Sequence, residues 1–333
     1  MRGVTARVYT NGRRLALGAS ATAAYWIGDE ALFALGDGAV IAAPREGETR
    51  RMAIHDGAIL STALHPDGKR LITGGDDGRL NAVAPAGQTQ TIAELRKWVD
   101  HIVANPASGV IVAGIGKEAI VFREGIESHR FAYASTVGGL ALDAKGRRLA
   151  ASHYGGVTLR YVLTADDKGV ALKWAGSHLA ITMSPEADYV ITGMQENALH
   201  GWRLPEKIDL RMDGYPSKTR SFSWDKRGRW LATSGANAAI VWPFTGKLGP
   251  QGKAPMQPGE RQALVTAVAF HPSEDVLAIG YGDGAAILVR LSDQAGVELD
   301  EPGEGAVTAL AWSSDGKRIA IGDEAGRGAI IDI

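Results

Sequence analysis

Residues Leu60–Val83 read LSTALHPDGKRLITGGDDGRLNAV, and this stretch decides the fold. Apolar residues recur at strand-like spacing over Leu60–Leu64, over Arg70–Gly74 and again in the run that ends at Val83. Pro, Gly and Asp residues, which favour tight turns, separate the three runs. Short alternating runs between such turns predict the order strand, turn, strand, turn, strand.

The same pattern recurs along the whole chain, each time around a short phrase that ends in a small residue. Eight copies, numbered here one to eight, read LFALG, RLITG, VIVAG, RLAAS, YVITG, WLATS, VLAIG and RIAIG, and they end at residues 36, 74, 114, 152, 193, 234, 280 and 322. Successive ends lie 38 to 46 residues apart. One such sheet cannot bury both of its faces alone, so the period predicts an array of similar sheets that pack against one another.

The repeated phrase resembles the WD40 repeat. The family pattern F-S-P-D-G-x-x-L-A-T-G-x-x-D-G-x-x-x-x-W is matched in outline by all eight copies and closely by copies two, seven and eight. The resemblance implies an all-β fold, a β-propeller. The eight copies predict eight four-stranded blades, with seven blades as the alternative. The resemblance also implies that the repeats are offset from the blades.

That offset predicts how the array closes. The last copy reaches only its third strand, Gly328–Ile333, so its fourth strand is expected from the N-terminus, near Arg13–Leu17. We therefore expect one domain over residues 1–333, with an N-terminal closing strand over residues 4–17 and blade repeats over residues 18–333. The alternative is a loose N-terminal tail.

The copies depart from the family in their polar residues. Copy two keeps His55, Thr73 and Asp77 at the family's hydrogen-bonded positions, but only two of the eight copies keep the family's tryptophan. The residues at the tryptophan position are Ala43, Val83, Phe122, Tyr161, Trp202, Trp242, Val289 and Ile331. The resemblance therefore supports the fold and leaves the specific function open.

Composition excludes several classes of function. The 36 Lys and Arg residues balance 37 Asp and Glu residues, so the chain lacks the basic excess typical of nucleic-acid binding. Cysteine is absent, which excludes disulfides, thiolate nucleophiles and cysteine-ligated zinc. No apolar run reaches the length of a membrane span, and the first residues lack the core of a signal peptide. We expect a cytoplasmic protein, monomeric on its own.

The motifs of catalysis are also missing. There is no G-x-S-x-G, and the glycine-rich phrases join strands, whereas a phosphate-binding loop needs a following helix. We therefore expect neither enzymatic activity nor a cofactor. Three histidines, His101, His153 and His178, fall near strand ends in consecutive copies and are weak candidates for a metal site. The alternative function is accordingly a propeller that binds a small ligand or metal, possibly as a hydrolase.

The leading interpretation is a scaffold for a protein partner of unknown identity. In the WD40 family, partners often bind the loops before the first strand and after the second strand of each blade. Copies three to six carry large side chains there, namely Arg96, Trp98, Tyr154, Gln195 and Lys218, whereas the other copies mostly carry Gly, Ala or Ser. We predict a contact patch centred near Trp98, the alternative being that Trp98 packs under its own loop. The aperiodic loop Thr245–Pro255 is either a docking element or simply tolerated length.

Overall fold

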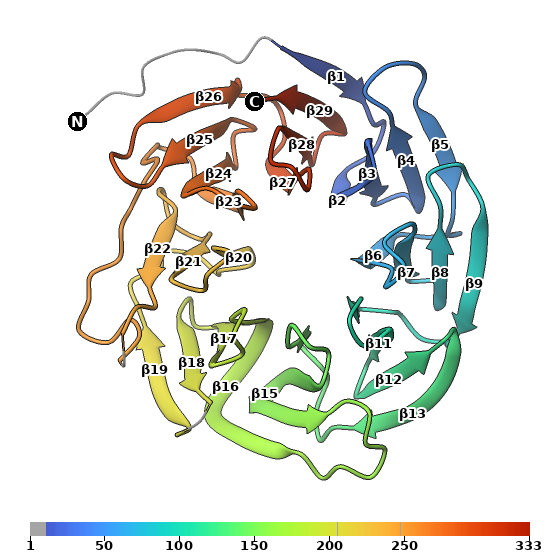
Figure 1. Cartoon of the computed structure of the whole chain (residues 1–333), viewed down its shortest axis with the longest axis vertical. Helices are drawn as coiled ribbons and strands as arrows, with labels where there is room; N and C mark the ends of the chain where they lie inside the picture. The colour runs from blue at the N-terminus through green and yellow to red at the C-terminus, as the bar shows by residue number, and fades with distance from the viewer. Residues whose placement is uncertain (1–10, 205, 247) are drawn as a thin grey trace. The chain divides into compact units, whose positions relative to one another are not determined.

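The computed structural model describes residues 11–204, 206–246 and 248–333 (Figure 1). Every regular element in this part of the chain is a strand, β1 to β29, and no helix there could cross a membrane. The described chain divides into two compact units. Unit one consists of residues 11–35, 43–48 and 215–333, and unit two of residues 36–42 and 49–214.

The strands follow the predicted turns. Those of unit one are β1 (Gly12–Ala16), β2 (Ala21–Ile27), β3 (Glu30–Leu35), β20 (Phe222–Trp224), β21 (Trp230–Thr233), β22 (Ile240–Pro243), β23 (Val265–Phe270), β24 (Val276–Tyr281), β25 (Ala286–Arg290), β26 (Gly296–Asp300), β27 (Val307–Trp312), β28 (Arg318–Asp323) and β29 (Arg327–Asp332). Those of unit two are β4 (Ala39–Ala43), whose last residue belongs to unit one, β5 (Arg50–Ala53), β6 (Ile59–Leu64), β7 (Leu71–Gly75), β8 (Arg79–Val83), β9 (Thr89–Glu94), β10 (His101–Asn105), β11 (Val110–Ile115), β12 (Glu118–Arg123), β13 (Ile126–Ala132), β14 (Gly139–Leu142), β15 (Arg148–Tyr161), β16 (Val170–Met183), β17 (Tyr189–Met194), β18 (Leu199–Arg203) and β19 (Ile208–Met212).

Hydrogen bonds join the described strands into seven sheets rather than the expected eight. The strand orders are β2-β3-β4-β5, β6-β7-β8-β9, β10-β11-β12-β13, β14-β15-β16-β17-β18-β19, β20-β21-β22, β23-β24-β25-β26 and β1-β29-β28-β27. The prediction of eight separate four-stranded blades is therefore wrong, and the alternative count of seven holds. Of the seven sheets, five have four strands, one has three strands and one has six strands.

The six-stranded sheet explains the difference. Strand β15 pairs with β14 through its first half and with β16 through its second half. The chain doubles back at Tyr154 and Gly155, since Val162 N donates to Arg147 O at 2.9 Å across the two ends of β15. Strand β16 then continues, through Gly176, into a segment that pairs with β17. Copies four and five thus share one sheet, since the last strand of copy four runs directly into the first strand of copy five. All eight sequence copies are present, but two of them are not separate sheets.

Strand β1 lies in the sheet of copy eight (Figure 1). It pairs antiparallel with β29, from Gly12 opposite Ile331 to Ala16 opposite Arg327. This is where the missing fourth strand of the last copy was expected. Residues 4–10 of the predicted closing strand lie outside the described residues. That residues 1–333 form a single domain stays a prediction.

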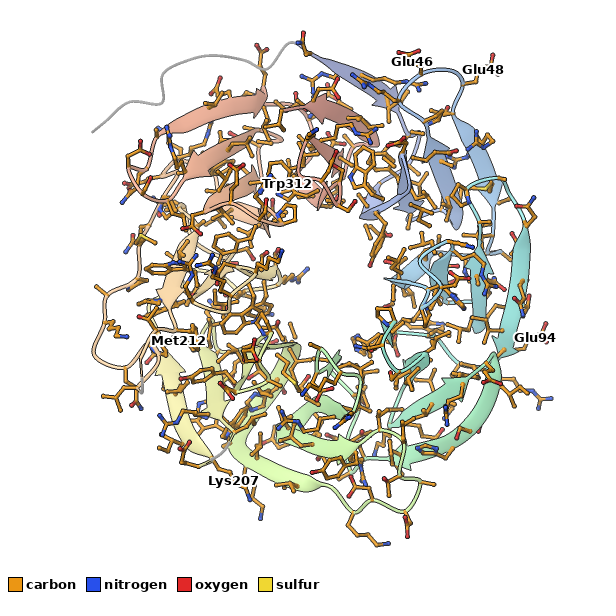
Figure 2. All side chains as sticks on the ribbon, in the orientation of Figure 1. Glu46, Glu48, Glu94, Lys207, Met212 and Trp312 are labelled. Carbon is orange, nitrogen blue, oxygen red and sulfur yellow. The ribbon has the colours of Figure 1, made fainter. Side chains whose placement is uncertain are left out.

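Neighbouring sheets within each unit pack through apolar faces. Leu288 and Ile319 are buried together between copies seven and eight, and Val121 and Leu149 between copies three and four. Each such side chain contributes roughly 1.5–3 kcal/mol through burial. Side-chain hydrogen bonds also join neighbouring first strands, namely Ser61 Oγ with Ile102 N (2.8 Å), Ser221 Oγ with Val268 N (3.0 Å) and Trp312 Nε1 with Ala269 O (3.1 Å; Trp312 is labelled in Figure 2).

The polar chain expected in copy two is present. His55 is buried, its Nδ1 lies 2.9 Å from Asp77 Oδ1, and its Nε2 lies 2.8 Å from Thr73 Oγ1. These bonds link the loop before β6, the second strand and the following turn. A satisfied buried network of this kind holds one local arrangement, because any displaced member leaves an unpaired polar group.

Copy six builds an equivalent chain from different residues. Tyr215 stands where copy two has His55, and its hydroxyl lies 2.7 Å from Thr233 Oγ1 and 2.7 Å from Trp242 Nε1. Thr233 donates onward to the carbonyl of Ile240 at 3.0 Å. The Trp242 indole therefore donates to the Tyr215 hydroxyl, which donates to Thr233. Burial raises the pKa of Tyr215 to about 12, so the hydroxyl stays a donor.

Removing this hydroxyl is expected to destabilise the protein. Tyr215→Phe leaves the half-buried Trp242 N–H and the buried Thr233 oxygen without their partner, which should cost about 2 kcal/mol of unfolding free energy. Urea unfolding followed by tryptophan fluorescence measures the loss. Tyr161→Phe is the matched control, because Tyr161 is 62% exposed. Equal stability of the two variants would contradict the role of the chain.

Candidate partner-binding surface

The loops that carry the predicted patch lie at the same end of each sheet. Because the strands of a sheet are antiparallel, the start of the first strand and the end of the second strand are adjacent. In unit two we call these segments the rim surface, comprising loops 54–58, 95–100 and 133–138, turns 76–78, 116–117 and 195–198, and residues 154–155 and 174–177 inside β15 and β16.

Hydrogen bonds join neighbouring segments of the rim surface. Each loop is bonded to the turn of the preceding copy or of its own copy, through Leu95 N to Gly78 O (2.7 Å), Val99 N to Gly75 O (3.1 Å), Val137 N to Gly116 O (2.8 Å), Tyr154 N to Ser135 Oγ (3.1 Å) and Gln195 N to Ser177 O (3.0 Å). The backbone beneath the exposed side chains is therefore held in place.

Trp98 projects from loop 95–100, whose backbone is hydrogen-bonded on both sides of it. Its side chain is 63% exposed, so the alternative that it packs under its own loop is wrong. The bonds from Leu95 and Val99 hold the loop on both sides of Trp98. Gly78 permits this close approach, because a Cβ there would lie 3.1 Å from the amide nitrogen of Arg96. Arg96 itself has a φ of 57°, a left-handed conformation that is unusual for a residue with a side chain.

The other predicted contact residues divide between the units. Tyr154 is 68% exposed on the two-residue turn of β15, and Arg96 and Gln195 are also exposed on the rim surface. Lys218 is half-buried and belongs to unit one, so it is described apart from the other four. Partner binding by all five residues stays a prediction.

The three candidate metal ligands are already engaged by the protein. His101 Nε2 lies 3.2 Å from the carbonyl oxygen of Val137. Both ring nitrogens of His153 and of His178 have partners, namely Tyr154 O (2.9 Å) and Thr158 Oγ1 (2.8 Å) for His153, and Thr192 Oγ1 (2.7 Å) and Trp174 O (3.2 Å) for His178. Burial lowers the pKa of His101 and of His178. Within the described residues, no group of three or more potential ligands meets.

A cavity that overlaps the rim surface was not foreseen from the sequence. It measures about 500 Å³ and is lined by His153, Gly155, Val157, Ala171, Leu172, Lys173, Trp174 and Ala175. Trp174 occupies, in copy five, the position that His55 holds in copy two. Its ring stacks on the buried His200, with centroids 4.0 Å apart and planes at 18°. Comparing the family's histidine position across all copies would have singled out this tryptophan.

Comparisons with known proteins agree with this architecture. The family model described as WD domain, G-beta repeat matches residues 48–81, the segment that contains the chain of His55, Thr73 and Asp77. The model described as anaphase-promoting complex subunit 4 WD40 domain matches residues 268–333. Both matches are to WD40 models, so these two segments of the chain are WD40 repeats.

Individual relatives of this WD40 protein are distant. Pre-mRNA-processing factor 19 of Oryza sativa subsp. japonica is 23% identical over 294 residues, which are 79% of this chain and 53% of that protein. The chain thus spans about half the length of this curated relative. The computationally designed Ika8 protein matches with a TM-score of 0.76 at 17% identity, over 95% of this chain and 96% of that chain. This likeness shows the β-propeller fold alone.

Proposed function

We propose that this WD40 protein is a non-enzymatic scaffold that holds a protein partner on the rim surface of unit two. The single observation that carries the proposal is Trp98, a large apolar side chain exposed on a loop whose backbone is hydrogen-bonded on both sides. Exposed tryptophans at the centre of an interface are the usual sites of concentrated binding energy. A preformed loop also reduces the entropy lost on binding.

The neighbouring residues support the same surface. Tyr154 adds a second exposed aromatic ring, and Arg96 adds a guanidinium on the same loop as Trp98. Tyr, Trp and Arg are the residue types enriched at interface centres. The WD40 repeats and the distant likeness to pre-mRNA-processing factor 19 also fit a scaffold. The cytoplasmic location and the monomeric state stay predictions.

The proposal predicts a large loss of affinity for Trp98→Ala. Truncating a central tryptophan costs about 2 kcal/mol or more, which is roughly a 30-fold weaker Kd. The partner would be captured from native cell extract on the immobilised chain, identified, purified, and titrated against each variant by calorimetry. Tyr154→Ala should weaken the same complex.

The matched control is Tyr161→Ala. Tyr161 lies in the same strand as Tyr154 and is nearly as exposed, but it is the last residue of β15, outside the rim surface. Its truncation should leave the Kd unchanged. A complex that tolerates Trp98→Ala and Tyr154→Ala, or that loses affinity equally with Tyr161→Ala, would contradict the proposed surface.

A further inference from the structure

The rim surface of unit two carries its positive charge in copy three. Arg96 and Lys97 lie on loop 95–100 together with Trp98, and Lys117 lies on the turn that follows β11. All three cationic residues are exposed. Within the described residues none of them makes an ion pair, and Lys117 Nζ donates to the backbone carbonyl of loop 133–138 at 3.2 Å. These three charges are therefore available to a partner.

The acidic residues of copy two are already engaged within that copy. Arg79 pairs with both Asp56 and Asp77, so one guanidinium serves two carboxylates. The third carboxylate, that of Asp76, lies over the loop that precedes β6, since a Cβ on Gly57 would overlap its Oδ1. The neighbouring copy thus does not supply ion pairs to the three cations of copy three.

Two further acids lie on the rim surface. Asp100 ends loop 95–100 and is half-buried. Glu196 belongs to copy five, where a Cβ on Gly176 would lie 3.1 Å from its Oε1. The copy-three part of the rim surface therefore holds three exposed cations against one half-buried acid. Such an excess acts on anionic groups over about 8 Å at physiological salt, so the cations need not touch Trp98 to influence what binds beside it.

We propose that the partner docks on copy three through an acidic segment of its chain, with an apolar side chain against Trp98 and carboxylates facing the three cations. This inference rests on the proposed scaffold function and adds the chemistry of the partner. The aromatic centre supplies most of the affinity, whereas complementary charge around it speeds association and excludes wrong partners. A basic segment would be repelled by the same three side chains.

Selection of peptides from a random phage-displayed library on the immobilised chain tests this chemistry. The peptides that the parent chain retains and Trp98→Ala loses should be enriched in Asp and Glu around an apolar residue. One such peptide, synthesised with a fluorescent label, gives the Kd by polarisation. Its binding should weaken severalfold between roughly 0.05 M and 0.5 M salt, because salt screens exposed charges.

The charge-reversed variant carries Arg96→Glu, Lys97→Glu and Lys117→Glu. It should bind the acidic peptide about tenfold more weakly or worse, because attractive contacts become repulsive. Selection on this variant should recover basic peptides instead. Urea unfolding of the variant checks that the fold is retained.

The matched control makes the same change of net charge at the other end of the sheets of unit two. There, turns 65–70 and 143–147 join first to second strands, and the exposed residues changed are Lys69→Glu, Lys145→Glu and Arg147→Glu. Because these turns lie away from the rim surface, the control should bind the acidic peptide as the parent chain does.

The possible results separate this inference from the scaffold proposal. Trp98-dependent peptides without acidic enrichment, or equal losses in the charge-reversed and control variants, would overturn the acidic partner and leave the rim surface as a binding site. Recovery of no Trp98-dependent peptide would overturn both. Single-stranded oligothymidylate that binds more tightly than the peptide, and is lost in the charge-reversed variant, would replace the protein partner with nucleic acid.

Discussion

Gly138→Ala is expected to cost about 3 kcal/mol of unfolding free energy or more. A Cβ at this position would lie 2.1 Å from the carbonyl oxygen of His178, far inside any allowed contact. The clashing atom belongs to the backbone of the six-stranded sheet, so rotating a side chain cannot relieve the clash. The loop 133–138 or strand β16 must move instead, which strains the bond from Gly138 N to Ser152 O.

The neighbouring glycine provides the control. A Cβ on Gly139 would lie 3.0 Å from the Cγ2 methyl of Ile181, a side-chain atom that can shift by a few tenths of an ångström. Gly139→Ala should therefore cost clearly less than Gly138→Ala. Urea unfolding of both variants measures the difference. Equal losses would mean that β14 and β16 pack less closely than the structure has them.

His200→Phe is expected to change how stability depends on pH. Burial lowers the pKa of His200 to about 4, with a further lowering from His178 and an opposing effect from Asp209, against an ordinary value of 6.5. Neither ring nitrogen has a hydrogen-bond partner among the described atoms, although Asp209 Oδ1 lies 3.7 Å from Nε2. The ring stacks on Trp174 and packs edge-on against Trp202.

The direction of this pH effect follows from whether the folded or the unfolded chain binds the proton. Above pH 6.5 this imidazole is neutral in both the folded and the unfolded chain, and it contributes no pH dependence. Between pH 6.5 and pH 4 the unfolded chain takes up a proton that the folded chain does not. Stability therefore falls as the pH falls through this window, by about 2 kcal/mol between pH 7.5 and pH 5.

Phenylalanine keeps the aromatic packing and removes the titration. The stability of His200→Phe relative to the parent chain should therefore rise by about 2 kcal/mol between pH 7.5 and pH 5. Urea unfolding of both chains at several pH values measures this difference in stability. The difference at pH 7.5 is the reference for the differences at lower pH. A difference that stays constant with pH would mean that His200 binds its proton equally well in both states.

Much of the fold was predictable from the sequence, because turn residues mark nearly every strand end. The phrases around Gly74 and Gly280, for example, are second strands followed by tight turns, as expected. The number of sheets was not predictable in the same way. The turn at Tyr154 and Gly155 resembles those of other copies, and nothing local shows that β16 continues through Gly176 into the next copy. Whether a backbone bends or continues there depends on tertiary packing, which one sequence does not display.

The site was predictable to a similar degree. The rim positions of Trp98 and Tyr154 followed from the repeat, and both side chains are exposed. The cavity did not follow, because Trp174 and His200 stand on different strands and meet only after folding. It was also not predicted that the Tyr215 hydroxyl would replace an imidazole. The family pattern names a residue type, whereas the structure needs only a donor at that place.

The pairing of β1 with β29 has a consequence for biosynthesis. The two strands are more than 300 residues apart, so β1 leaves the ribosome long before the strand that it pairs with. Until then the backbone groups of β1 form an open edge that other strands can pair with. A chain that terminates before Arg327 leaves this edge exposed for good, which would mark truncated translation products for chaperones and proteases.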